Sequence, residues 1–233
     1  GAAAGAALGA CWQLSGKRPE YIRSLALGSE ETDEAIQSVL ESCHISYIKV
    51  DNIAEAVADE LAEGCIVGWF QGRMEAGPRA LGQRSILADP RRTEMRDRIN
   101  KAVKFREHWR PFCPSMPAED AYKYLQSYTD APFMNIAFQA TEMLTEKAPG
   151  IVHIDGTVRV QLVHYDILPL FHSLLKAFEK RTDIAVLLNT SFNIKGEPVV
   201  CTFSDALRTF FASGLDVLAA GQFIVRKKMK EAI

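Results

Sequence analysis

Arginines and glycines are concentrated in one segment, Gly72 to Ser85, whose sequence is GRMEAGPRALGQRS. Glycines let the backbone approach a ligand, and guanidinium groups bind phosphate or carboxylate oxygens through paired hydrogen bonds. The side chains that could do so here include Arg79, Arg84 and Ser85. The segment lacks the GxxxxGK[ST] spacing of a P-loop. Two interpretations remain open: an anion-binding loop, or arginines that pair with nearby carboxylates and water.

A second basic run surrounds Lys104. Lys101 and Lys104 are three residues apart on a predicted helix and share one of its faces. Arg106 and Arg110 follow, and Arg110 leads into an irregular, proline-containing segment that could fold inward. A solvated basic face is the more common fate of such a run. The sequence alone therefore favours neither arginine as the one that contacts a ligand.

Polar side chains with hydrogen-bonding capacity occur in two later segments. Arg159 alternates with apolar residues after an Asp-Gly turn, which places it on the polar side of a strand, facing either solvent or a site. The run 189–193, NTSFN, leaves the end of an apolar strand. Its members, including Ser191 and Asn193, can bind phosphate oxygens or an amide, or can form a turn through their own side chains. No metal-ligand spacing of the HExxH type is present, so we expect no metal site built by this chain.

The elements that must position these segments alternate between strands and helices. Apolar runs predict strands at 46–50, 65–70, 185–188, 216–219 and 223–225. Helices are predicted to begin at the capping residues Thr32, Asn52, Thr93 and Ser204. A further helix is indicated around 170–178 by its apolar periodicity. This order predicts an α/β (α+β) fold, with a mixed sheet and flanking helices.

Breaker residues predict the connections. Residues 71–89 read as a loop and 108–117 as irregular, because glycines and prolines interrupt them. Asp155-Gly156 predicts a hairpin over 151–163. Residues 1–14, rich in Gly and Ala, predict a helix that packs against something else, and 14–29 predicts a linker.

Composition restricts the class of protein. The 233 residues are 48% hydrophobic and carry a net charge of −2, as expected for a soluble globular protein. Residues 73–110 hold eleven Lys and Arg against five Asp and Glu, which indicates an anionic ligand for that segment rather than a nucleic-acid partner for the whole surface. The five scattered cysteines predict buried, reduced thiols, and no apolar run could cross a membrane. We therefore expect a cytoplasmic protein.

Three blocks of sequence carry a resemblance to a known family. These are residues 68–114, the run HIDGTVRVQLV at 153–163, and the run LLNTSFNIKGEPVVCTFSDALRTF at 187–210. Together they resemble the O-carbamoyltransferases that act on tobramycin, cephems and nodulation factors. The resemblance extends over nearly the whole chain, and its motifs are long and specific.

The resemblance implies a fold and a division of labour. Residues 31–233 would form a YrdC-like twisted mixed sheet with flanking helices, similar to threonylcarbamoyl-adenylate synthases. Residues 1–30 would be the tail of a larger, actin-like ATPase-type N-terminal domain, together with a linker. The YrdC-like part would join carbamoyl phosphate and ATP, with Mg²⁺ on the nucleotide, into carbamoyl adenylate. The N-terminal domain, the partner that would hold iron or another metal, would then transfer the carbamoyl group to an acceptor hydroxyl.

Site residues follow from the matched motifs. The resemblance places Lys104, Arg110, Arg159 and Ser191 among the catalytic residues, and Arg79, Arg84, Ser85, Arg106 and Asn193 among those that bind the nucleotide. Lys104-Phe105-Arg106 and Ser191-Phe192-Asn193 resemble the KxR and SxN patterns of YrdC-type proteins. Two alternatives remain: a non-catalytic basic module that binds nucleotides or RNA, and a structural lid for the N-terminal domain. Aromatic residues within the basic run are few, which argues against RNA.

Overall fold

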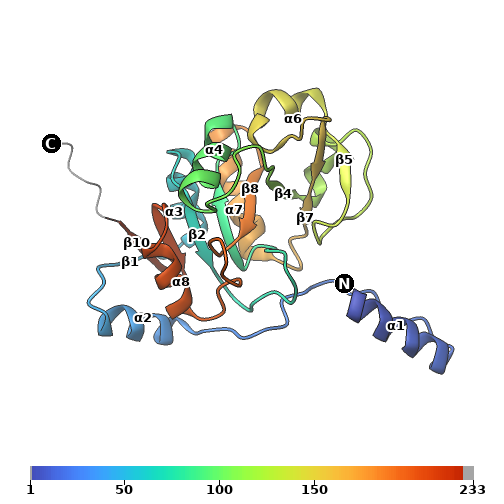
Figure 1. The fold of residues 1–233 in the computed structure, drawn as a ribbon, viewed down its shortest axis with the longest axis horizontal. Coiled ribbons are helices and arrows are strands. Elements are labelled where there is room, and N and C mark those ends of the chain that lie inside the picture. The colour runs from blue at the N-terminus through green and yellow to red at the C-terminus, as the bar shows by residue number, and fades with distance from the viewer. Residues whose placement is uncertain (1, 228–233) are drawn as a thin grey trace.

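The protein is built on a mixed sheet of eight strands in the order β1-β10-β9-β2-β3-β8-β4-β7, beside a small sheet of β5 and β6 (Figure 1). The computed structural model describes residues 2–227. Its strands are β1 (Ile48–Lys49), β2 (Val67–Phe70), β3 (Arg84–Ala88), β4 (Cys113–Pro117), β5 (Ala137–Gln139), β6 (Thr157–Arg159), β7 (Gln161–Val163), β8 (Leu187–Ser191), β9 (Val217–Ala220) and β10 (Phe223–Arg226). Pairing is parallel for β2–β9 and β4–β7 and antiparallel for the other pairs. The predicted mixed α/β fold is confirmed.

Helices flank the large sheet, and several of them begin at a residue whose side chain caps the first turn. They are α1 (Ala2–Ser15), α2 (Asp33–Ser42), α3 (Ile53–Ala62), α4 (Thr93–Ala102), α5 (Ala121–Tyr124), α6 (Glu142–Lys147), α7 (Pro169–Thr182) and α8 (Phe203–Phe211). Thr32 and Asn52 cap α2 and α3 as predicted, each accepting a hydrogen bond from a first-turn amide. The predicted caps Thr93 and Ser204 are wrong. Thr93 already lies inside α4, and Thr202 caps α8 instead.

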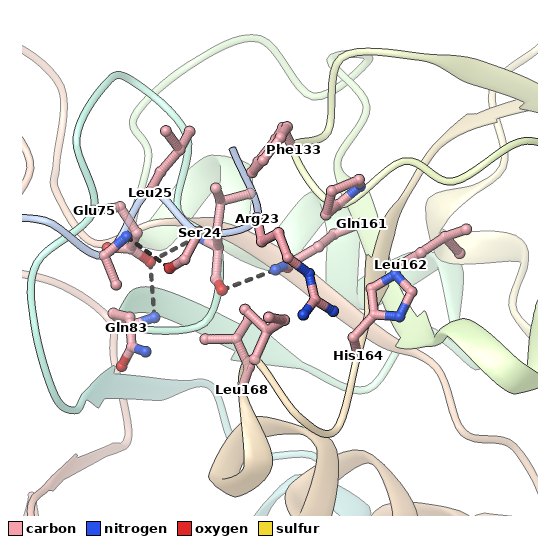
Figure 2. A pocket seen from close by; sticks show the side chains of 14 residues that line it. Arg23, Ser24, Leu25, Glu75, Gln83, Phe133, Gln161, Leu162, His164 and Leu168 are labelled. Carbon is pink, nitrogen blue, oxygen red and sulfur yellow. Dashed lines mark hydrogen bonds between the residues drawn. The ribbon is translucent and has the colours of Figure 1, made fainter. Parts of the chain in front are cut away.

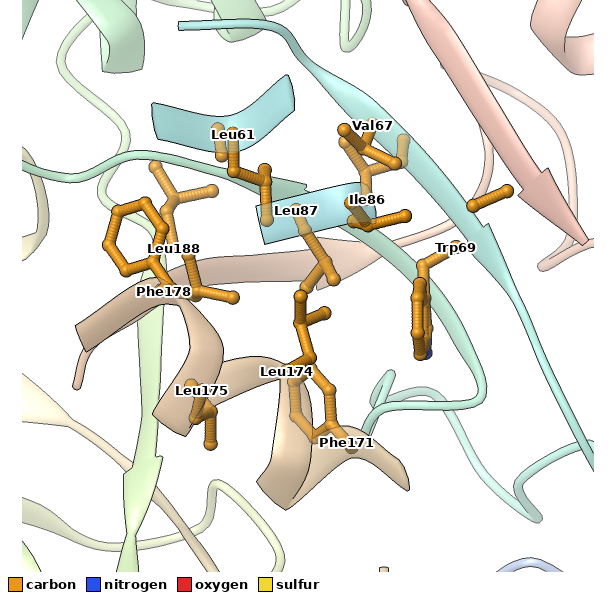
Figure 3. Close-up of a cluster of buried hydrophobic side chains, with 14 of the residues drawn as sticks. Leu61, Val67, Trp69, Ile86, Leu87, Phe171, Leu174, Leu175, Phe178 and Leu188 are labelled. Atoms are coloured by element: carbon orange, nitrogen blue, oxygen red, sulfur yellow. The ribbon is translucent and has the colours of Figure 1, made fainter. Parts of the chain in front are cut away.

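The core lies where α3 and α7 meet the middle of the sheet. Side chains of β2, β3 and β8 interdigitate there with those of the two helices (Figure 3). Trp69, Leu174 and Phe178 are completely buried, and each such side chain stabilises the fold by about 1.5–3 kcal/mol. The Trp69 indole donates to the Gly82 carbonyl oxygen at 2.9 Å, so its one polar group is satisfied. This rigid centre supports the loops at the ends of β3, β4 and β8.

Two segments that were predicted to be irregular contain strands from the interior of the large sheet. The loop predicted at 71–89 ends at residue 83, and Arg84–Ala88 forms β3 between β2 and β8. Residues 113–117, also predicted to be irregular, form β4. Pro114 pairs only with β8 and Pro117 pairs only with β7, whereas Ser115 between them pairs with both. A proline is tolerated in such a strand because each one has a neighbour on a single side.

The predicted hairpin at 151–163 is wrong. Asp155-Gly156 does form a tight turn, in which the His153 amide donates to the Thr157 carbonyl oxygen at 2.9 Å. Residues 152–154 nevertheless form no strand, and Pro149–Ile151 is a short 3-10 helix. The strand after the turn pairs with β5 instead, so its partner comes from outside the predicted segment.

The N-terminal helix α1 extends away from the rest of the molecule, and none of its residues is buried (Figure 1). The segment that follows is bound to the body at 25–28, where the Gly28 amide donates to the Met74 carbonyl oxygen at 2.8 Å. All five cysteines are free. Cys113 is buried as predicted, but the predicted burial is wrong for Cys11, Cys43 and Cys201, which are exposed.

Candidate functional site

The basic segment after α4 is shaped by a left-handed residue and a buried asparagine. Phe105 has a φ of 47°, and the chain reverses there between Lys104 and Arg106. The Asn100 side-chain amide donates to the carbonyl oxygens of His108 and Arg110, both at 3.0 Å, while its Oδ1 accepts from Arg106 Nε at 2.7 Å. Asn100 therefore holds the whole 104–110 segment in place. The sequence analysis missed it; its signal was an amide on the apolar face of a helix end.

Lys104 is buried against the turn at the end of β8. Its Nζ donates to the Ser191 carbonyl oxygen, and to the carbonyl oxygen and Oδ1 of Asn193, both at 2.9 Å. Ser191 Oγ donates to the same Oδ1 at 2.7 Å. Burial, followed by the neighbouring Arg106 charge, lowers the pKa of Lys104 to about 7. The KxR and SxN patterns thus meet in one hydrogen-bonded unit that holds a charge sensitive to pH.

A cationic cavity lies beside this unit, and we call it the arginine cavity. It is lined by Pro78, Arg79, Ala80, Arg106, Pro111, Phe112, Cys113, Met134, Arg159, Asn189, Thr190 and Ser191. Its three guanidinium groups come from the 71–83 loop, the segment after α4 and the end of β6. The antiparallel pairing of Cys113 with Asn189 brings the start of β4 and the end of β8 together at its base.

None of the three arginines of the cavity has a carboxylate partner in the part of the chain that the structure describes. Arg159 donates through Nε and Nη2 to the Cys113 sulfur at 3.2 and 3.0 Å. The Arg106 guanidinium lies 4.5 Å from the centre of the Phe112 ring. Within residues 2–227, Arg79 makes no side-chain hydrogen bond or ion pair, and it is exposed at the mouth. Burial, and then Arg110, lower the pKa of Arg106 to about 10. Three positive charges close together favour an anionic ligand.

A second cavity, the lysine cavity, adjoins the first. It is lined by Lys104, Arg106, Glu107, Arg110, Thr190, Ser191, Asn193, Ile194, Lys195 and Gly196. Arg106 and Ser191 line both cavities, so the two form one extended basic site. Arg106 thus lies deeper than Arg110, which is exposed at the rim and 3.9 Å from Glu107.

The predicted binding roles of Arg84 and Ser85 are not supported by their positions, because neither lines these cavities. Arg84 is completely buried; its guanidinium donates to the carbonyl oxygens of residues 71, 72 and 83 and lies 3.7 Å from the Phe70 ring centre. Ser85 Oγ accepts from the Gly82 amide at 3.1 Å. Both side chains therefore hold the 71–83 loop in shape.

The amides of that loop are occupied by an internal anion. Glu75 is buried, and its carboxylate accepts from the amides of Leu81 at 2.7 Å, Gln83 at 2.8 Å and Arg84 at 3.1 Å. These three amides are consequently not free to bind a phosphate, although the glycine-rich composition of the loop had suggested such a role. The loop contributes to the arginine cavity through the side chain of Arg79 instead.

A buried amide network reaches the lining of the arginine cavity through Asn189. Asn189 Nδ2 donates to Ser115 Oγ at 2.9 Å and to Gln161 Oε1 at 3.2 Å, and Ser115 Oγ donates to the same Oε1 at 2.8 Å. Gln161 Nε2 donates to the Leu81 carbonyl oxygen at 2.8 Å. The three side chains are at most 1% exposed. They connect β4, β7 and β8 under the site.

A further cavity is lined by Gln161 together with residues of the N-terminal segment (Figure 2). We call it the linker cavity, because residues 23–26 form one of its walls. Its ionisable side chains are already partnered: Arg23 binds Asp166 at 2.7 Å, His164 contacts Asp130 at 2.7 Å, and Glu75 accepts from loop amides. It therefore lacks the unpartnered positive charge of the arginine cavity.

Residues 58–227 match the family model described as Carbamoyltransferase C-terminus. The chain belongs to this family. It is 42% identical to the nodulation protein NolO of Bradyrhizobium diazoefficiens over 97% of its length, and 36% identical to the 3'-hydroxymethylcephem-O-carbamoyltransferase of Amycolatopsis lactamdurans over 72%. These alignments cover 43% and 32% of the two relatives, so the chain spans less than half of either. The predicted family is confirmed.

Two solved structures show the same fold at low sequence identity. Full-length HypF in its phosphate- and nucleotide-bound form matches 78% of this chain and 23% of its own, with a TM-score of 0.53 and 18% identity. Sua5 of P. abyssi, complexed with L-threonine, matches 72% of this chain and 46% of its own, with a TM-score of 0.50 and 14% identity. The predicted YrdC-like fold is confirmed for this carbamoyltransferase C-terminal chain.

Two further observations concern residues 2–227. No helix there combines the length and apolar character needed to cross a bilayer. No cluster of three or more His, Cys, Asp or Glu side chains there could hold a metal ion.

Proposed function

We propose that the extended basic site binds carbamoyl phosphate and ATP and converts them to carbamoyl adenylate. The observation that carries this proposal is the convergence of Arg79, Arg106 and Arg159 with the Lys104 unit in two adjoining cavities. Two polyanions must approach each other in such a reaction, and closely spaced cations offset their repulsion. Two cavities that share a wall provide a place for each.

The chemistry can be written with balanced atoms. Water cleaves carbamoyl phosphate to carbamate and phosphate, and a carbamate oxygen then attacks the α-phosphorus of ATP. The carbamoyl adenylate keeps that oxygen, and pyrophosphate leaves. The attacking oxygen is already anionic, so the second step needs no general base. Arg79 and Arg159 would hold the phosphate of carbamoyl phosphate, while Lys104, Ser191 and Asn193 would orient the nucleotide phosphates.

Magnesium fits this site only as a companion of the nucleotide. Among the described residues, the arginine cavity has no carboxylate in its lining and the lysine cavity has Glu107 alone. Magnesium prefers several oxygen ligands, and the phosphates of ATP would supply most of them. Its role would be to neutralise phosphate charge, beside the arginines.

In this proposal, an N-terminal domain transfers the carbamoyl group to an acceptor hydroxyl. The matched relatives are longer than this chain, so they have room for such a domain. The Amycolatopsis relative is named for carbamoyl transfer to a hydroxymethylcephem. We assign the activating step to this chain and the acceptor step, with any iron or other metal, to that partner domain. Both substrates are cytoplasmic metabolites, so we place the reaction in the cytoplasm.

Calorimetry and a product assay test this proposal. We expect the chain to bind ATP-Mg²⁺ and carbamoyl phosphate separately, and to release pyrophosphate when both are present. We also expect no carbamoylation of an added alcohol by this chain alone. Failure to bind either substrate would contradict the proposal. Salt-sensitive RNA binding without ATP binding would favour the non-catalytic RNA-binding alternative.

A further inference from the structure

One buried polar atom of a residue that lines the arginine cavity has no hydrogen-bond partner among the described residues. Asn189 is 1% exposed and lines the cavity, and its Oδ1 makes no hydrogen bond to any described residue. A buried acceptor that remains unpaired is costly, so such atoms in native proteins usually mark a missing ligand or water. The Asn189 side chain otherwise belongs to a well-satisfied network.

The hydrogen bonds of that network fix the orientation of the Asn189 amide. Its Nδ2 faces three acceptors: Ser115 Oγ, Gln161 Oε1 at 3.2 Å, and the Ala80 carbonyl oxygen at 3.4 Å. Turning the amide over would bring Oδ1 against two oxygens that cannot donate. The unpaired atom is therefore an acceptor, and it calls for an N–H or O–H donor.

The charged side chains of the cavity wall have the opposite hydrogen-bonding character to Asn189 Oδ1. Arg79, Arg106 and Arg159 are all donors, which select the anionic oxygens of a ligand. A ligand that satisfies both the arginines and Asn189 must carry anionic oxygens and, close to them, a hydrogen-bond donor. A carbamoyl phosphate has this combination, because its NH₂ group is attached to the carbon that bears the phosphate.

We propose that Asn189 is a specificity-determining residue, whose Oδ1 accepts a hydrogen bond from the carbamoyl NH₂ group of the substrate. The inference rests on the proposed function and extends it to the discrimination between acyl phosphates. Acetyl phosphate has nearly the same shape, but it presents a methyl group where carbamoyl phosphate presents NH₂. Its binding would leave Oδ1 buried and unpaired.

Binding of three ligands to the unmodified 233-residue chain tests this inference without any variant. We expect carbamoyl phosphate to bind at least about tenfold more tightly than acetyl phosphate, because a site built for an N–H rejects an analogue that lacks it. Inorganic phosphate reports the arginine contribution alone. Equal binding of the two acyl phosphates would overturn the inference while leaving the proposed function intact. No binding of any of the three would instead refute the proposed function.

A pair of variants separates recognition from a purely structural role. Asn189→Leu keeps the side-chain size and removes the acceptor, so the ratio of carbamoyl to acetyl phosphate affinity should fall to about one while inorganic phosphate still binds. Ser115→Ala removes a network partner but leaves two acceptors to orient Asn189 Nδ2. This control should keep the ratio of the unmodified chain. Loss of the ratio in Ser115→Ala, or its retention in a folded Asn189→Leu, would contradict a direct role for Oδ1.

Discussion

Two basic regions of the molecule hold their charges in opposite ways. On the face formed by α3 and α7, Arg181 binds Glu55 at 2.7 Å and Asp59 through Nε, and Lys180 binds Glu55 at 3.1 Å. In the arginine cavity, by contrast, the Arg159 guanidinium has only the Cys113 sulfur as a hydrogen-bond partner among the described residues. Hydrogen bonds to Asp59 raise the pKa of Arg181, whereas burial lowers the pKa of Arg106 to about 10.

The difference teaches how to distinguish a binding cation from a structural one. A cation paired with acids, like Arg181, already has its charge offset and gains little from a ligand. Burying cations side by side without acids costs free energy, and proteins keep such arrangements mainly where function requires them. The number of basic residues in each region is similar, so the information lies in the absence of carboxylates from the arginine cavity lining among the described residues.

The largest expected effect is the loss of anion binding when a cavity arginine is removed. Arg159→Ala should weaken carbamoyl phosphate binding by roughly 10- to 150-fold, because a charge-assisted hydrogen bond contributes about 1.5–3 kcal/mol. Arg181→Ala is the matched control and should leave the affinity unchanged. Calorimetry on both variants makes the comparison. A control that weakened binding as much would remove the distinction between the two regions.

A smaller effect is expected from pH, through Lys104. Its pKa is lowered to about 7, so the free protein loses this charge as the pH rises through neutrality. An anion favours the protonated form, and binding therefore takes up a proton. Affinity for sulfate, whose own charge is constant in this range, should fall by at most about tenfold per pH unit above pH 7. Titrations from pH 6 to 9 measure the slope, and Lys104→Met should flatten it; a flat profile in the unmodified chain would contradict a ligand contact with Lys104.

The smallest expected effect is that of a neutral hydroxyl. Ser191→Ala should weaken ATP binding by about two- to tenfold, since a neutral hydrogen bond contributes about 0.5–1.5 kcal/mol. The turn should survive, because Lys104 still donates to Asn193. Ser173→Ala, on the exposed side of α7, is the matched control for loss of a serine hydroxyl. A loss as large as that of Arg159→Ala would mean that Ser191 does more than orient a phosphate.

Much of the fold could be predicted because its signals are local. The caps at Thr32 and Asn52, the buried strand at 67–70 and the final strand pair all depend on neighbouring residues. Strand β4 could not be predicted in this way. Its prolines are tolerated only because β7 and β8 overlap at Ser115 alone, and such one-sided pairing is a property of the assembled sheet.

The same distinction between local signals and properties of the assembled fold applies to the candidate site. The polar side of a strand was a correct prediction for Arg159, since Val158 and Val160 on either side of it are buried. Arg84 resembled Arg79 in the sequence, yet one is sealed under the loop and the other lines the cavity. The Glu75 carboxylate explains why the two arginines differ. It binds amides at the end of the loop and so holds the loop over Arg84. Glu75 binds backbone amides, which leave no pattern in the side chains, whereas Asn100 left one signal, an amide on the apolar face of a helix end.

The order of strands in the large sheet has a consequence for the synthesis of the chain. β2 and β3 lie in its middle, but β2 pairs with β9 and β3 pairs with β8, both translated about 100 residues or more later. A nascent chain that has not yet reached residue 217 leaves the β9-facing edge of β2, a strand of fully buried residues, without its partner. Long-range pairing of this kind slows folding. The core of the domain is therefore completed only when its last strands have left the ribosome. Until then, the unpaired edge of β2 leaves the nascent chain prone to aggregation.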